Sequence, residues 1–251
     1  MKKLLDRMMR EWLPVPGKRL LVECARRNFM ECTLRAMRAN GFAPDAIIDV
    51  GAYIGGWTKL VRKVFPAARV LMIEAQPGKK PVLEALANRD ENITFRSALL
   101  GAAPQEAVRF FTMETGSSIY AENSGAPRNE ISLPMSTLDD VAADAGFADA
   151  RHMLLKLDVQ GAELDVLRGA ERVLPNVAAV LVEVSLVEYN LGAPGVLDVI
   201  HFMQEQGFVI YELAGFRRIR NVMGQLDLVF ARHDSPLRST WRKGDRRGAS
   251  P

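Results

Sequence analysis

The sequence predicts an α/β fold, with a mostly parallel sheet of seven strands and helices on both of its faces. Two observations predict this class. Short runs rich in Val, Ile and Leu alternate along the chain with segments of helical periodicity, as in parallel strands joined by crossover helices. The chain is also large enough for one such domain, because it has 251 residues, of which 48% are hydrophobic.

The first two strand–helix units are the most clearly marked. Ala46–Val50 is a continuous apolar run of the kind that parallel sheets bury on both faces, and Gly56–Val64 then has helical spacing. Arg69–Glu74 is the second strand, and a helix is expected near Gly78–Asn88. Pro77 restricts the chain between them, which favours a held turn after the strand.

The alternation is interrupted after the third strand, Asn92–Ser97. The runs Val108–Met113 and Glu130–Met135 are short and apolar, and they flank the polar stretch 116–129. We therefore expect a β-hairpin insertion with a flexible tip. The alternation then resumes, with helices at Thr137–Ala145, Ala162–Val173 and Gly195–Gln206, and strands at His152–Asp158, Ala178–Val184, Phe208–Leu213 and Leu226–Ala231, the last two joined by a basic loop.

Residues 1–42 and 233–251 differ in character from the predicted sheet domain, 43–232. The first segment has the pattern of two amphipathic helices broken by prolines and a glycine, the second helix near Leu20–Ala39. The last segment is a basic, polar tail that we expect to be disordered. Basic residues exceed acidic ones by six in residues 1–39 and by four in residues 231–251, which leaves a net charge of −7 on the remainder.

This distribution of charge bears on the possible partners. An acidic centre argues against a nucleic-acid groove in the body of the domain. The basic N-terminus can contact an anionic membrane surface or an acidic partner, or it can serve solubility alone. The N-terminal helices are also candidates for a homodimer contact or for a cap over a ligand site of the domain.

Cysteine usage and hydropathy predict a cytoplasmic protein. Cys24 and Cys32 lie eight residues apart, which is about 12 Å along a helix and too far for a disulfide, so both are expected to be reduced. No apolar run reaches the roughly 20 residues that span a bilayer. The N-terminus also lacks the continuous apolar segment of a secretory signal.

The loop between the first two strands predicts a bound cofactor that contains adenosine. Glycines let the backbone approach a ligand, and a carboxylate that ends the second strand can accept hydrogen bonds from both ribose hydroxyls. The spacing differs from the G-x-G-x-x-G pattern of dinucleotide sites, so S-adenosylmethionine, which has no phosphates, is favoured. We expect loop N–H groups to face the carboxylate of its methionine part. The predicted cofactor-binding residues in this region are Asp49, Gly51, Ala52, Tyr53, Gly55, Glu74 and Ala75.

Three further strand ends belong to the same predicted site, because ligands of open α/β sheets bind beyond the carboxyl ends of the strands. Ser97 and Ala98 end the third strand, where an adenine ring would rest; alternatively they are small residues that allow close packing. Asp158 ends the fourth strand, where it faces the reacting part of the cofactor. Glu183 ends the fifth strand.

Five motifs resemble those of the FkbM family of S-adenosylmethionine-dependent methyltransferases: DVGAYIGGWT (49–58), IEAQP (73–77), STLDDV (136–141), LLKLDVQGAELDVLRGAE (154–171) and LVEVS (181–185). The resemblance covers about residues 47–187. It implies a class I methyltransferase fold, which is Rossmann-like, and O-methylation of a hydroxyl on a saccharide or secondary metabolite. Tyr53 stands where many relatives carry Asn or His, and Gln160 where many carry Glu.

Methyl transfer to an alcohol needs a group that orients the hydroxyl and removes its proton. Asp158 is the first candidate for this catalytic role, Glu183 the second and Glu188 the third. The hairpin insertion either covers the acceptor and excludes water, or it is a surface feature without such a role.

No metal is expected, because no His or Cys cluster has zinc spacing. An oxygen-rich Mg²⁺ site is a less favoured alternative, assembled from Asp139, Asp140, Asp158 and Glu183. Three other functions stay open. One is an NAD-type nucleotide-dependent oxidoreductase, which Glu74 permits and the glycine spacing disfavours. Another is a nucleic-acid methyltransferase that uses the basic ends as clamps, which the acidic centre disfavours. The third is a non-catalytic adenosyl-binding module.

Overall fold

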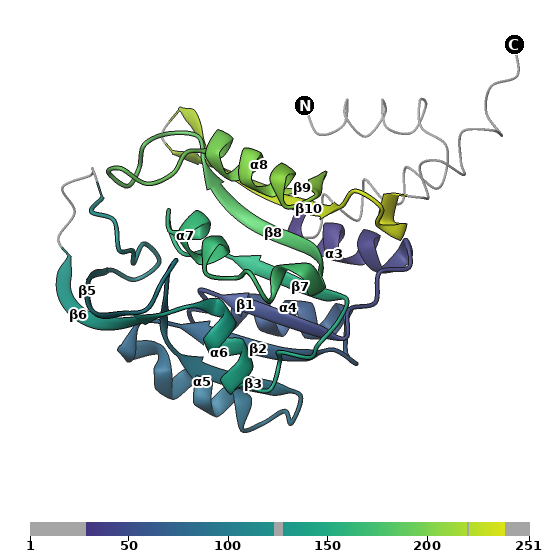
Figure 1. The fold of residues 1–251 in the computed structure, drawn as a ribbon, viewed down its shortest axis with the longest axis horizontal. Coiled ribbons are helices and arrows are strands. Elements are labelled where there is room, and N and C mark those ends of the chain that lie inside the picture. The colour runs from purple at the N-terminus through teal and green to yellow at the C-terminus, as the bar shows by residue number, and fades with distance from the viewer. Residues whose placement is uncertain (1–28, 123–127, 220, 239–251) are drawn as a thin grey trace, which may run out of the picture.

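The structure, a computed structural model, describes residues 29–122, 128–219 and 221–238. A seven-stranded sheet in the order β3-β2-β1-β7-β8-β10-β9 forms its centre (Figure 1). Strand β10 runs in the opposite direction to the other six strands, so the predicted mostly parallel sheet is confirmed. The strands are β1 (Ala46–Val50), β2 (Arg69–Glu74), β3 (Ile93–Ser97), β7 (Met153–Leu157), β8 (Val177–Ser185), β9 (Phe208–Ile219) and β10 (Val222–Arg232).

The order of the strands reverses beside β1. The chain runs outward from β1 through β2 to β3, and β7 then pairs with the opposite side of β1. In open α/β sheets such a reversal creates a crevice at the carboxyl ends of the strands. The register places Asp49 of β1 opposite Lys156 of β7, and Glu74 of β2 opposite Ser97 of β3.

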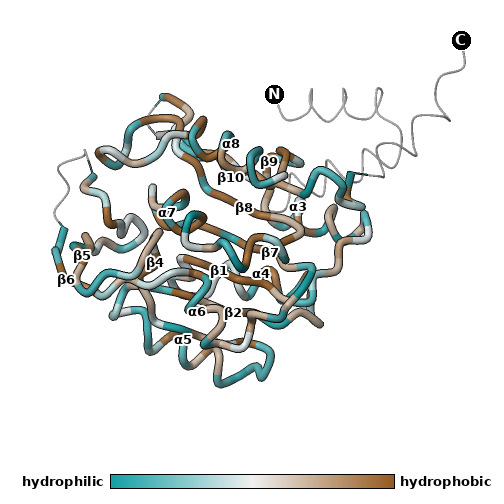
Figure 2. Tube along the Cα trace, viewed as in Figure 1, coloured by the Kyte–Doolittle hydropathy of each residue, from teal (hydrophilic) through white to brown (hydrophobic). Residues whose placement is uncertain are grey.

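Helices cover both faces of this sheet, as predicted. Successive residues of a strand point to opposite faces, so Ile48 and Val50 belong to one hydrophobic core and Ile47 to the other. The strands that supply both cores are hydrophobic along their length (Figure 2). The first core is closed by α6 (Leu138–Asp144), α7 (Glu163–Arg168) and α8 (Val196–Glu205), and the second by α3 (Phe29–Ala39), α4 (Gly56–Val64) and α5 (Lys80–Ala87).

The predicted hairpin insertion is present as part of a second sheet. Strands β5 (Gln105–Thr112) and β6 (Asn129–Ser136) pair antiparallel, and the two-residue strand β4 (Leu99–Leu100) joins β6 in parallel. Phe110 and Met135 pack with Leu99 in a small core of their own. This sheet stands at the carboxyl-end side of the central strands (Figure 1).

Three elements differ in extent from the sequence prediction. Helix α7 ends at Arg168 instead of Val173, because the Asp139 carboxylate accepts hydrogen bonds from the backbone N–H groups of Arg172 and Val173 and so diverts them from helical bonding. Strands β9 and β10 extend through the segment predicted as a basic loop. The exposed Arg217 and Arg218 lie on an edge strand, where charged side chains remain in water.

Short 3₁₀ turns complete the described chain: η1 (Pro77–Lys79), η2 (Leu174–Asn176) and η3 (Pro236–Arg238). The first predicted N-terminal helix, Cys24 and most of the basic tail lie outside the described residues, so those predictions stay untested. No helix in the part that the structure describes is long and apolar enough to cross a membrane.

Candidate functional site

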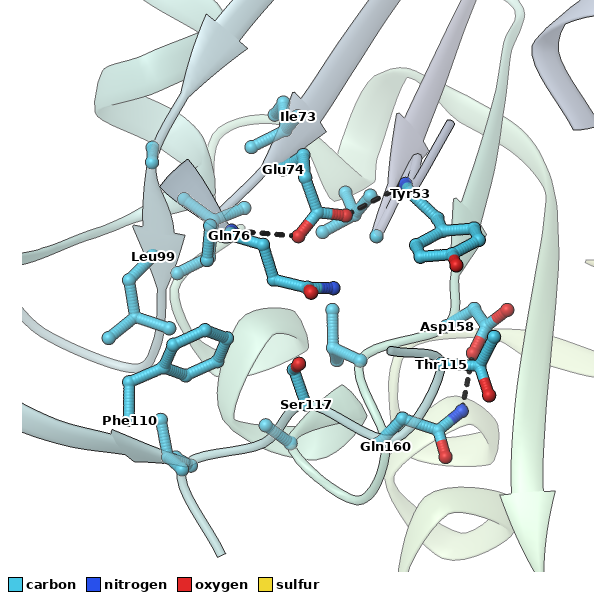
Figure 3. Close-up of a pocket in the computed structure, with 18 of the residues that line it drawn as sticks. Tyr53, Ile73, Glu74, Gln76, Leu99, Phe110, Thr115, Ser117, Asp158 and Gln160 are labelled. Atoms are coloured by element: carbon cyan, nitrogen blue, oxygen red, sulfur yellow. Dashed lines mark hydrogen bonds between the residues drawn. The ribbon is translucent and has the colours of Figure 1, made fainter. Parts of the chain in front are cut away.

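A cavity of about 720 Å³ lies at the carboxyl ends of β1, β2 and β7, against the inserted sheet. It is lined by six of the predicted site residues, namely Gly51, Tyr53, Glu74, Ala75, Ala98 and Asp158. Leu99 and Phe110 form an apolar wall on the side away from Asp158 (Figure 3), and Leu100 also lines the cavity. No Lys or Arg is among the described residues that line it, which suits a ligand without phosphates.

Glu74 is fixed in this cavity by two backbone hydrogen bonds. Its Oε2 accepts from the N–H of Tyr53 at 2.8 Å, and its Oε1 accepts from the N–H of Gln76 at 2.9 Å (Figure 3). Burial raises the pKa of Glu74, while both of these N–H groups and Lys156 oppose that shift. A carboxylate oxygen has two lone pairs, so each oxygen can accept one more hydrogen bond, as a ribose diol requires.

The glycine loop brings the ends of β1 and β7 into contact. Gly51 has a φ of +75°, and a Cβ on it would lie 1.9 Å from the backbone oxygen of Asp158. The N–H groups of Gly51 and Ala52 donate to the carbonyl of Ile73, and that of Gly55 donates to the carbonyl of Ala52. These three N–H groups are therefore already used within the protein, and the expectation that loop N–H groups face a ligand carboxylate stays a prediction for the rest of the loop.

Asp49 does not line the cavity but stabilises the glycine loop through buried contacts. It is fully buried, accepts a 2.6 Å hydrogen bond from Thr58 Oγ1 and pairs with Lys156 Nζ at 3.0 Å. Lys156 also donates to the carbonyl of Gly51 at 3.0 Å. Burial lowers the pKa of Lys156, but Asp49 and Asp158 more than compensate, so the net shift is upward and the lysine stays charged.

Gln160 joins the two candidate catalytic carboxyl groups. Its Nε2 donates to Asp158 Oδ1 and to Glu183 Oε1, each at 2.8 Å, so these oxygens lie within two hydrogen-bond lengths of one another. Glu183 Oε1 also accepts from Gln225 Nε2 at 2.8 Å. Burial, followed by repulsion from Asp158 and other acids, raises the pKa of Glu183 to about 9, so this carboxyl is protonated at neutral pH.

The turn that carries Asp158 and Gln160 is held by Glu163. Its carboxylate accepts from the N–H groups of Val159 at 2.9 Å and Gly161 at 2.9 Å. Burial raises the pKa of Glu163 to about 7, although those N–H groups pull it the other way. Gln160 itself has a φ of +55°, a left-handed conformation that the turn imposes on a non-glycine residue.

The insertion forms one wall of the cavity, which favours the first of the two roles predicted for it. Glu114 Oε2 accepts from Tyr53 Oη at 2.6 Å and from Lys79 Nζ at 2.7 Å, and this hydrogen bond to Lys79 lowers the pKa of Glu114. Ser118 is buried and donates to the backbone oxygen of Gln160 at 2.7 Å. The insertion therefore contacts the loops that follow β1 and β2, through Tyr53 and Lys79, and also the turn that carries Asp158.

A second cavity of about 790 Å³ lies on the side of α3 and α4. Asp158 lines it as well as the first, together with Lys156, Glu183 and Asp227. The apolar part of its lining comes from Trp57, Leu60, Leu157, Leu181 and Met30. Asp158 is thus the common boundary of two cavities.

Several predicted site residues lie elsewhere. Ala52 and Gly55 are buried in the loop, and Ser97 is exposed at the end of β3, so none of them lines the first cavity. Glu188 accepts from the N–H of Gly192 in a surface loop and lines neither cavity. Asp139 caps the end of the α7 segment, away from Asp158.

Among the described residues, no three His, Cys, Asp or Glu side chains are grouped so that they could hold a metal ion. The predicted Mg²⁺ alternative is not assembled, because Asp139 is engaged with backbone N–H groups and Asp140 pairs with Arg172 at 2.6 Å.

Sequence reasoning missed the polar residues that β10 and the insertion contribute. Asp227 is marked in the sequence as a charged residue inside an apolar run, Leu226 to Phe230, and the structure places it half-buried. Glu114 carries no comparable signal, because polar residues in a turn are usual.

The comparisons with known proteins agree with this geometry. Residues 49–210 match the family model for the methyltransferase FkbM domain. The chain belongs to the FkbM methyltransferase family. This is a family of S-adenosylmethionine-dependent enzymes, and the match spans both the glycine loop and the Asp158 turn.

Solved structures share the fold. A methyltransferase FkbM from Methylobacillus flagellatus KT aligns with a TM-score of 0.50 and 18% identity, covering 74% of this chain and 43% of that chain. Magnesium protoporphyrin IX methyltransferase from Synechocystis PCC 6803, solved with bound SAM, aligns with a TM-score of 0.45 and 10% identity, covering 81% and 77%. This FkbM-family chain thus spans less than half of the first structure. No curated protein matches it.

Proposed function

We propose that this FkbM-family protein transfers a methyl group from S-adenosylmethionine to a hydroxyl of a saccharide or secondary metabolite. Family membership supports the reaction class and the cofactor. The first cavity supports the cofactor independently, because it offers a carboxylate for a ribose diol and an apolar wall for adenine, and its described lining residues include no basic side chain for phosphates. The N–H groups of Gly51, Ala52 and Gly55 donate hydrogen bonds within the protein. This disfavours a dinucleotide, because a pyrophosphate needs such donors.

The single observation that carries the reaction is the position of Asp158 between the two cavities. When bound, S-adenosylmethionine supplies an electrophilic methyl group, whose bond to sulfur breaks with the electron pair left on sulfur. As the acceptor oxygen forms its new bond to carbon, Asp158 accepts the proton that this oxygen loses. Gln160 at 2.8 Å and Lys156 at 3.6 Å hold the carboxylate in one orientation.

Glu183 has a different role in this proposal. A carboxyl whose pKa is about 9 holds its proton at neutral pH, so it donates a hydrogen bond and does not act as a base. Its Oε1 accepts from both Gln160 and Gln225, which leaves Oε2 to carry the proton. Glu183 therefore helps to orient the acceptor, and Asp158 receives the acceptor's proton.

The test is to incubate the protein with S-adenosylmethionine labelled in its methyl group and an extract of its own host, and to identify the labelled product. We expect an O-methyl product, and we expect Asp158→Asn to bind S-adenosylhomocysteine normally while losing most of the labelling. Cofactor binding without labelling of any compound would point to a non-catalytic adenosyl-binding module. Thermal stabilisation by NAD but not by S-adenosylhomocysteine would contradict the cofactor assignment.

A further inference from the structure

The second cavity is a site in its own right, separate from the one that fits the cofactor. It lies on the opposite side of Asp158, and Trp57, Leu181 and Glu183 line it without lining the first cavity. A ligand in it would meet the cofactor's reacting group only at Asp158.

The charges around this cavity select against an anionic ligand. Asp158, Glu183 and Asp227 contribute three carboxyl groups, and Lys156 is the one cation among the described residues that line it. Lys156 is already paired with Asp49 at 3.0 Å and Asp158 at 3.6 Å. Among the described residues, a phosphate or carboxylate on the ligand would therefore find no free positive partner, and it would face the charged Asp158 and Asp227.

The two carboxyl groups nearest to the first cavity are complementary to a neutral hydroxyl. Asp158 can accept a hydrogen bond, and Glu183 can donate one from Oε2, which receives no hydrogen bond from the residues that the structure describes. Gln160 holds the two groups within two hydrogen-bond lengths. A hydroxyl needs this combination, because its oxygen accepts and its hydrogen is donated.

Another part of the lining is apolar. Trp57, Leu60 and Leu181 contribute it, and Leu181 is buried in the second hydrophobic core. An aromatic ring offers a flat apolar surface to the C–H face of a saturated ring. The ligand therefore has one hydroxylated edge and one apolar face.

We propose that this second cavity is the acceptor site, and that it takes an uncharged, polyhydroxylated ring seated on Trp57, with one hydroxyl between Asp158 and Glu183, in preference to its anionic analogues. This inference rests on the proposed function and names the class of acceptor. It excludes acceptors that carry a phosphate or carboxylate on the ring itself.

Two probes with the same ring test the proposal: phenyl β-D-glucopyranoside, which is neutral, and phenyl β-D-glucuronide, which carries a carboxylate. Both are titrated by NMR into the full chain saturated with S-adenosylhomocysteine. We expect saturable binding of the glucoside and at least tenfold weaker binding of the glucuronide. Asp227→Asn, which removes one nearby negative charge, should reduce that preference. No saturable binding of the glucoside, or equal binding of both probes, would overturn the proposal.

Matched variants locate the binding. Trp57→Ala should abolish glucoside binding and Trp57→Phe should keep it. Glu183→Gln should change it less than threefold, since an amide donates as a protonated carboxyl does, and Glu183→Leu should weaken it at least tenfold.

All four variants should bind S-adenosylhomocysteine as the parent does. Parallel loss of cofactor binding would mean that this cavity holds part of the cofactor, and unchanged glucoside binding in Trp57→Ala would place the ring elsewhere. Failure of the parent to bind S-adenosylhomocysteine would instead count against the proposed function.

Discussion

Replacing Glu74 with Gln changes the group that the cofactor assignment depends on most. The two carboxylate oxygens accept from the N–H groups of Tyr53 and Gln76 at 2.8 and 2.9 Å, and each has one lone pair left for a ribose hydroxyl. The substitution turns one oxygen into an NH₂ group, which can accept neither bond. A hydrogen bond to a charged group contributes about 1.5–3 kcal/mol. We therefore expect S-adenosylhomocysteine affinity to fall by about 3 kcal/mol, or roughly 150-fold in Kd.

Isothermal titration calorimetry measures this change directly. Glu84→Gln is the matched control, because Glu84 lies on α5, is half-exposed and pairs only weakly with Lys80 at 3.7 Å. Burial raises the pKa of Glu74, so this carboxylate takes up a proton at a higher pH than an ordinary carboxylate does. The parent should therefore lose S-adenosylhomocysteine affinity as the pH falls through that raised pKa. Glu74→Gln should not show this loss. A folded Glu74→Gln variant whose Kd changes by less than threefold would refute the reasoning.

Three further predictions concern catalysis, the loop and stability. Asp158→Asn should reduce kcat by about 10²- to 10⁴-fold, the usual contribution of a general base, with S-adenosylhomocysteine affinity kept within about threefold; full activity in single-turnover assays would exclude Asp158 as the base. Gly51→Ala should destabilise the fold by at least about 2 kcal/mol, because its Cβ would collide with the Asp158 carbonyl 1.9 Å away, whereas Gly56→Ala, whose Cβ meets nothing within 4 Å, should not; equal melting temperatures would contradict this. Burial raises the pKa of Glu183 from 4.5 to about 9, so the folded state keeps a proton that the unfolded chain releases, and this carboxyl costs stability increasingly as pH rises across that window. Glu183→Gln should therefore be more stable than the parent by an amount that grows, to a few kcal/mol, between pH 5 and pH 8; urea titrations that show a constant difference would disprove it.

The parallel strands and the cofactor end of the site were predictable from sequence for one physical reason. A strand buried on both faces needs a continuous apolar run, so the bounds of β1 and β2 are those predicted. A charged residue that ends such a run lies at the carboxyl end of its strand. Glu74 and Asp158 were found in this way. Their separation in sequence by α5, α6 and the inserted sheet did not matter, because parallel strands bring their carboxyl ends together.

The remaining features depend on contacts that local pattern does not encode. The Asp49–Lys156 pair is set by the register of β1 on β7. The raised pKa of Glu183 results from burial and from repulsion by acids on other elements, among them Asp158 and, on the antiparallel strand, Asp227. The early end of α7 results from the distant Asp139. The extension of β9 escaped prediction because a bulge between Leu213 and Gly215 breaks the alternation.

The most direct measurement is a crystal structure of the protein with S-adenosylhomocysteine. The account predicts the nucleoside in the cavity beside Phe110, with both ribose hydroxyls on Glu74 and the sulfur directed toward Asp158. A ribose bound away from Glu74, or a ligand bound only in the cavity beside Trp57, would contradict it.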